Sequence, residues 1–154
     1  MLAFEKIAVQ TDDFDVAAEI AALRSHPAIG AVVTFIGTVR DINDGDSVST
    51  LTLEHYPGMT EKALADIVAQ ARQRWDVMGV TVIHRVGLLK PCDQIVFVAV
   101  AGAHRGQCFE ACEFIMDYLK TEAPFWKKEQ TTEGERWVEA RVSDDQAMAR
   151  WVSE

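Results

Sequence analysis

The stretch from His104 to Glu129 limits how this chain can fold more than any other. Apolar residues recur in it at intervals of three and four, at Cys108, Ala111, Cys112, Ile115, Met116 and Leu119. This spacing predicts a helix with one buried stripe. Pro124 ends that helix, because proline has no N–H group and crowds the preceding turn. The rest of the chain therefore has to provide an apolar surface that covers the stripe.

An apolar strand and a short turn lead into this helix. Residues 95–101 read I-V-F-V-A-V-A, the most apolar strand pattern in the chain, and we expect them at the centre of a sheet. Residues 102–106 form the turn. Free N–H groups at a helix N-terminus attract anions, and Arg105 adds a positive charge. The pattern indicates an anion site near His104 and Arg105, although many unrelated proteins share such a turn.

Cationic residues also gather at the other end of the helix. Lys120 lies at the edge of the apolar stripe, and Lys127 and Lys128 follow two aromatic residues. The whole chain is acidic, with a formal net charge of -9, so a local group of lysines suggests an anionic ligand. A lysine that lays its stem along the apolar face and keeps its ammonium in water is the other interpretation of Lys120.

Length and composition exclude several classes of protein. A chain of 154 residues fits one domain, which we expect to span 1–154. No apolar run approaches the roughly 20 residues that cross a bilayer, and the N-terminus lacks the pattern of a signal peptide. The acidic charge argues against broad nucleic-acid binding. We therefore expect a cytoplasmic protein that binds neither membranes nor nucleic acids.

The cysteines and the acidic loop do not predict a metal site. Cys108 and Cys112 fall on the apolar side of the helix, and Cys92 follows a proline in a turn. No C-x-x-C pair or second Cys/His cluster supplies further ligands. The loop D-I-N-D-G-D-S at 41–47 lacks the pattern of a calcium-binding EF-hand loop, and we interpret it as a hairpin. We expect free thiols, no metal and no cofactor.

The remaining patterns alternate between strands and helices. We expect strands at 4–9, 29–37, 48–56, 80–86 and 136–142, and helices at 14–23, 60–75 and from about 144 to 151. We interpret residues 130–134 as a loop. His84 lies in a predicted strand, and we expect a half-buried structural residue there. These elements predict an α+β domain with a mixed sheet.

Four segments of the chain carry a family resemblance. They are A-V-V-T-F-I-G-T-V-R at 31–40, L-T-L-E-H-Y-P-G-M-T-E-K at 51–62, A-H-R at 103–105 and F-I-M-D-Y-L-K-T-E-A-P-F-W-K-K-E at 114–129. Together they resemble the catalytic, or large, subunit of molybdopterin synthase. The resemblance implies an α/β-hammerhead type of domain, with a mixed, mainly antiparallel sheet and flanking helices.

The resemblance also implies an activity and two kinds of partner. A large-subunit homodimer binds two small ubiquitin-like sulfur-carrier subunits, which makes a heterotetramer. Each carrier ends in Gly-Gly with a C-terminal thiocarboxylate. The enzyme transfers two sulfurs from this group to cyclic pyranopterin monophosphate, or precursor Z. The product is molybdopterin, whose dithiolene binds molybdenum in the molybdenum cofactor.

Matched residue by residue, the resemblance implies a set of functional side chains. Lys120 and Lys127 correspond to the catalytic lysines. The substrate-binding positions fall on Thr38, Val39, Arg40, His104, Arg105, Lys120, Lys127, Lys128 and Glu129. Relatives often have lysine where this chain has Thr38, which removes one possible charge contact.

The predicted helix is too long for one substrate to reach both of its ends. Arg105 and Lys120 stand roughly 22 Å apart along it, and a pyranopterin monophosphate is on the order of half that length. A two-fold axis can bring the helix start of one chain to the helix end of another. We therefore predict a composite pocket with Arg40, Lys120 and Lys127 from one protomer, and His104, Arg105 and Arg141 from its neighbour.

Two other functions fit an anion-binding α+β domain. The first is a non-catalytic subunit that binds phosphate and presents a carrier protein, in which Lys120 is replaceable. The second is a hydrolase of cyclic phosphates that uses His104 as an acid or base and needs no sulfur carrier.

Overall fold

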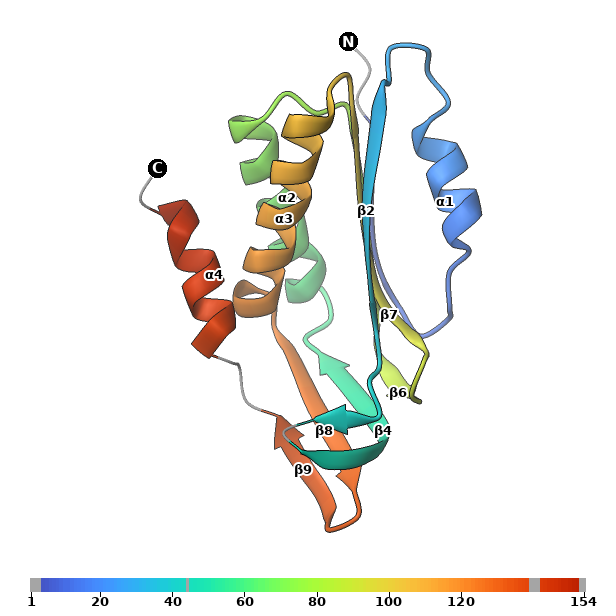
Figure 1. The fold of residues 1–154 in the computed structure, drawn as a ribbon, viewed down its shortest axis with the longest axis vertical. Helices are drawn as coiled ribbons and strands as arrows, with labels where there is room; N and C mark the ends of the chain where they lie inside the picture. Colours follow the sequence, from blue (N-terminus) through green and yellow to red (C-terminus); the bar gives the residue numbers. More distant parts are fainter. Residues whose placement is uncertain (1–3, 44, 139–141, 153–154) are drawn as a thin grey trace.

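A four-stranded sheet with the order β1-β5-β7-β2 forms the centre of the molecule (Figure 1). In this computed structural model, residues 4–43, 45–138 and 142–152 are described. The strands are β1 (Phe4–Gln10), β2 (Ala31–Thr38), β5 (Gly79–Arg85) and β7 (Gln94–Gly102). β1 and β5 are parallel, and the other neighbours are antiparallel. β7 is a central strand, which confirms the prediction from its apolar run.

Helices cover both faces of this sheet (Figure 1). α2 (Met59–Arg74) and α3 (Arg105–Glu122) pack on one face, and α1 (Val16–Leu23) packs on the other. α4 (Val142–Val152) lies against α3. All six residues of the predicted α3 stripe are buried, and they pack against the valines of β5 and β7. The periodic pattern therefore identified both the helix and its buried face.

A second, antiparallel sheet lies below the first in Figure 1. Its order is β3-β4-β8-β9, with β6 paired to β4. The strands are β3 (Ile42–Asn43), β4 (Asp46–His55), β6 (Gly87–Leu89), β8 (Phe125–Thr131) and β9 (Gly134–Val138). A smaller core of Val39, Leu51, Leu53, Val86 and Leu89 holds it to the first sheet.

Two predictions for the C-terminal third were wrong. Residues 130–131 belong to β8 rather than to a loop. This strand was not predicted, because F-W-K-K-E-Q-T has no apolar alternation. β8 forms because β4 and β9 supply hydrogen-bond partners on both of its edges. The predicted strand at 136–142 was too long, since β9 ends at Val138 and Val142 already belongs to α4.

Phe114 of α3 provides a test of this packing. Its ring is fully buried and lies 5.3 Å from the Trp75 ring and 5.6 Å from the Trp151 ring, both edge-on. We expect Phe114→Ala to lower the free energy of unfolding by about 3–5 kcal/mol, because it leaves a cavity beside these two aromatic rings. Phe109→Ala on the same helix should cost less than about 1 kcal/mol, since Phe109 is 59% exposed.

Chemical denaturation followed by circular dichroism measures both variants. Equal losses for Phe114→Ala and Phe109→Ala would contradict the assigned buried face of α3.

Candidate functional site

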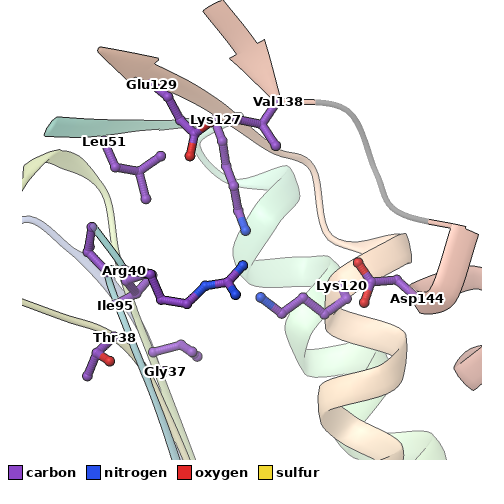
Figure 2. Close-up of a pocket in the computed structure, with 12 residues that line it drawn as sticks. Gly37, Thr38, Arg40, Leu51, Ile95, Lys120, Lys127, Glu129, Val138 and Asp144 are labelled. Carbon is purple, nitrogen blue, oxygen red and sulfur yellow. The ribbon is translucent and has the colours of Figure 1, made fainter. Parts of the chain in front are cut away.

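A pocket of about 370 Å³ opens where the two sheets and the C-terminal end of α3 meet (Figure 2). Its lining comes from seven strands and helices and from the segment that follows β2. The lining residues are Gly37, Thr38, Val39, Arg40, Leu51, Ile95, Val96, Lys120, Lys127, Glu129, Val138 and Asp144. Segments far apart in the sequence therefore build one site.

Three cationic side chains converge in this pocket. Figure 2 shows the Arg40 guanidinium and the Lys120 ammonium pointing toward each other, with the Lys127 ammonium close to both. Within residues 4–43, 45–138 and 142–152, no carboxylate forms an ion pair with Arg40 or Lys120. Like charges brought together repel one another, and a bound anion relieves the repulsion. The pocket is therefore suited to an anionic ligand.

Each cation is held by a different part of the fold. Val39, next to Arg40, is buried, and its backbone N–H donates to the Asp93 carbonyl at 2.9 Å. Lys120 lies in the last turn of α3, where the negative end of the helix dipole favours a cation. Lys127 lies on β8, the strand between β4 and β9. The convergence thus depends on the packing of both sheets against α3.

Two carboxylates also line the pocket. Glu129 is only 6% exposed, and the Arg136 guanidinium on β9 donates to it at 3.3 Å. This arginine offsets the cost of burying the Glu129 charge. Asp144, at the start of α4, lies on the side of the pocket that Lys120 occupies (Figure 2). The wall therefore contains both signs of charge, and the three cations point into the cavity.

His84 lies next to the cations as a neutral, buried ring. It is 4% exposed, so the expected half-buried position was wrong, because the Phe125 ring of β8 covers it. The two rings stack at 3.7 Å, with 16° between their planes. Burial, together with the nearby Lys120 and Lys127 charges, lowers the pKa of His84 to about 3. Its Nδ1 lies 2.8 Å from the Arg85 carbonyl, which requires a proton on Nδ1.

The structure brings six of the predicted site residues into the pocket. They are Thr38, Val39, Arg40, Lys120, Lys127 and Glu129. Lys128 lies on the other face of β8, because neighbouring residues of a strand point to opposite faces. Its ammonium lies 4.9 Å from the Trp137 ring and 3.6 Å from Glu135.

The other predicted residues lie elsewhere. His104 is the N-cap of α3 and Arg105 is its first residue, so both are at the end of the helix opposite to Lys120 (Figure 1). Arg141 lies outside the described residues. Within one chain, the pocket therefore contains Lys120 from one end of α3 but neither His104 nor Arg105 from the other end.

Some pocket residues were not predicted. The sequence did carry a signal for Gly37, since this residue directly precedes Thr38. The structure adds that a Cβ atom at position 37 would meet Val96 Cγ1 at 2.9 Å. The sequence carried no signal for Val138 and Asp144. They line the pocket because β9 and α4 pack beside residues that are distant in the sequence. Ile95 and Val96 belong to a strand that was predicted, but its end could not be placed beside α3 from sequence.

The thiols of α3 are unreactive. Cys108 and Cys112 are buried, and burial raises the pKa of both thiols, that of Cys112 to about 12. Cys92 is exposed in a turn. Among the described residues, no group of three His, Cys, Asp or Glu side chains could hold a metal ion. None of the described helices is long and apolar enough to cross a membrane.

Comparisons with known proteins agree on one family. The family model described as MoaE protein matches residues 9–122. The molybdopterin synthase catalytic subunit of Ralstonia nicotianae is 70% identical over 146 residues, which cover 94% of this chain and 83% of the relative. The molybdopterin synthase catalytic subunit of Escherichia coli is 62% identical over 150 residues, which cover 97% of this chain and 100% of the relative. The solved MoaE protein of Burkholderia ambifaria superimposes with a TM-score of 0.84 at 59% identity, over 98% and 100% of the chains.

The buried His84 gives the stability of the protein a defined pH dependence. The unfolded chain binds a proton at this residue below about pH 6.5, whereas the folded chain does so only near pH 3. The contribution of His84 to the free energy of unfolding is therefore fully present above about pH 6.5, and it is lost as the pH drops from 6.5 toward 3. Between pH 7 and pH 5 we expect a loss of about 2 kcal/mol from this residue.

Urea denaturation at both pH values measures that loss. His84→Phe is the control, because it keeps an aromatic ring and removes the titrating group. If the variant loses as much stability as the unmodified protein over this pH range, His84 is not the cause.

Proposed function

Because the chain belongs to the MoaE family, which includes the molybdopterin synthase catalytic subunits, we propose that its pocket carries out sulfur transfer to cyclic pyranopterin monophosphate. The observation that supports this assignment is the convergence of Arg40, Lys120 and Lys127 in one cavity. Both reactants are anions, since one carries a phosphate and the other a thiocarboxylate. A pocket with three cations can hold both together.

The three cations have different chemical roles in this proposal. Arg40 offers a planar fork of N–H donors that matches two oxygens of a phosphate or carboxyl group. Lys120 and Lys127 are the catalytic residues, which neutralise the sulfur-donor group and transfer protons as sulfur moves to the pterin. Thr38, Val39 and Glu129 complete the substrate-binding wall.

The sulfur comes from a partner protein. Burial raises the pKa of both thiols of α3, which disfavours the thiolate form that acts as a nucleophile. In this proposal a small ubiquitin-like carrier, which the family resemblance implies, brings the sulfur as a C-terminal thiocarboxylate on a Gly-Gly tail. Such a tail is narrow and extended, and Leu51, Ile95 and Val138 give the pocket apolar walls for its backbone.

A second copy of the chain completes the site. His104 and Arg105 lie at the far end of α3 from Lys120, roughly 22 Å away along the helix, so they serve the pocket of a neighbouring protomer. Arg141, outside the described residues, joins this group in the proposal. Two catalytic subunits and two carriers then form a heterotetramer, which we place in the cytoplasm.

Lysine substitutions test the catalytic assignment. We expect Lys120→Ala to lower turnover at least about 100-fold, because a charge used in the transition state contributes several kcal/mol. Lys127→Ala should have a similar but smaller effect. Lys62→Ala, an exposed lysine of α2 that does not line the pocket, is the matched control and should keep full activity.

The measurement is molybdopterin formation from the cyclic pterin and thiocarboxylated carrier. Near-normal activity of Lys120→Ala would favour a non-catalytic scaffold. Hydrolysis of the cyclic phosphate in the absence of the carrier, measured separately, would favour a hydrolase.

Mixing two inactive variants tests the composite pocket. One site of each mixed dimer of Lys120→Ala and Arg105→Ala chains keeps every residue intact. Random exchange should therefore restore about a quarter of normal activity, since half of the dimers are mixed and each has one working site. Subunit exchange is verified by native mass spectrometry. Absence of recovery after complete exchange would show that both residues act within one chain or that Arg105 lies outside the site.

A further inference from the structure

Lys120 and Lys127 lie on either side of one sharp corner. α3 ends at Glu122, and β8 begins at Phe125 after only two residues. The Phe125 N–H donates to the Ala123 carbonyl at 2.9 Å, which closes the corner tightly. Any shift of the corner would therefore move the ends of both elements that carry the lysines.

Phe125 connects this corner to the central sheet. It lies two residues before Lys127, so both side chains point to the same face of β8. On that face its ring stacks on His84 of β5 at 3.7 Å. β5 belongs to the first sheet and β8 to the second. The stack is thus a direct contact between the two sheets, and the Lys120 and Lys127 charges are close enough to act on His84.

The His84 ring is itself held in place. It is 4% exposed, and its Nδ1–H donates to the Arg85 carbonyl at 2.8 Å. Its strand neighbour on β7 is Val96, which lines the pocket. The His84 ring is thus held by its hydrogen bond to the backbone, by the pairing of β5 with β7 and by burial. A ring held in this way can also hold the Phe125 ring that stacks on it.

We propose that His84 is a positioning residue for sulfur transfer, which sets the places of Lys120 and Lys127 through its stack on Phe125. This inference rests on the proposed function of the pocket. Histidine suits the position because it provides a flat ring with a hydrogen-bond donor for the Arg85 carbonyl and remains uncharged. The charged groups that face it are Lys120 and Lys127, with the His55 ring also nearby, and a protonated ring would repel the ammonium groups.

Leucine substitutions remove the stack from either side. We expect His84→Leu and Phe125→Leu each to lower turnover at least about tenfold at 25 °C, and the double variant to lose less than about threefold more, because both remove the same contact. Val82→Ala is the control. Val82 is fully buried on the same face of β5 and does not line the pocket. Truncation of its side chain should therefore lower the melting temperature and leave turnover per folded molecule within about threefold of the unmodified protein.

A second measurement reports lysine placement without catalysis. Acetylation rates of Lys120 and Lys127, read by mass spectrometry, should change at least about threefold in both leucine variants, whereas Lys62 should not change. His84→Phe keeps the stacking ring and should restore both readouts to within about threefold of the unmodified protein. If His84→Leu does not fold, Phe125→Leu and His84→Phe still decide the question.

Unchanged acetylation rates, or equal losses of turnover in Val82→Ala and Phe125→Leu after correction for the folded fraction, would overturn the positioning role. If the unmodified protein forms no molybdopterin, the proposed function fails instead. The acetylation rates then still show whether the stack places the lysines.

Discussion

The packing of α3 against the central sheet is the interaction on which the rest of the structure depends. The α3 stripe lies on the valines of β5 and β7 in the cluster with the most buried residues, and burial of apolar surface is the dominant favourable term in folding. Because the stripe fixes how far α3 extends along the sheet, it also fixes where the helix ends. That end carries Lys120 and turns the chain into β8, so the same apolar contact that stabilises the domain also sets the geometry of the pocket.

Gathering three cations in one cavity carries an electrostatic cost that the fold offsets in part. The last turn of α3 favours the Lys120 charge, and Glu129 places a carboxylate in the wall beside Lys127. His84, which lies near these lysines, stays neutral, and this keeps a fourth positive charge out of the site. The remaining excess of positive charge is available to a ligand. A chain with a net charge of -9 repels anions at long range, so the local arrangement of the pocket has to provide their recognition.

The parts of the fold that depend on local pattern were predictable, and those that depend on pairing across the chain were not. The α3 stripe and the apolar run of β7 specified a buried helix and a central strand. β8 was missed because its charged sequence forms a strand only between β4 and β9. The same limit applies to the site. Arg40, Lys120 and Lys127 were identified by motif, whereas Val138, Asp144 and the stack of His84 on Phe125 follow from how the two sheets meet.

The lysine doublet on β8 makes the pocket tolerant of a length change in the strand. Lys127 faces the cavity and Lys128 faces away, since successive residues alternate. Loss of one residue between Phe125 and Lys127 would slip the following residues by one position, and Lys128 would then take the inward place. Glu129 would turn outward in exchange. A deletion at this point would therefore preserve the cation and lose the buried carboxylate, so the ion pair of Glu129 with Arg136 is more sensitive to the length of this strand than the inward-facing lysine charge is.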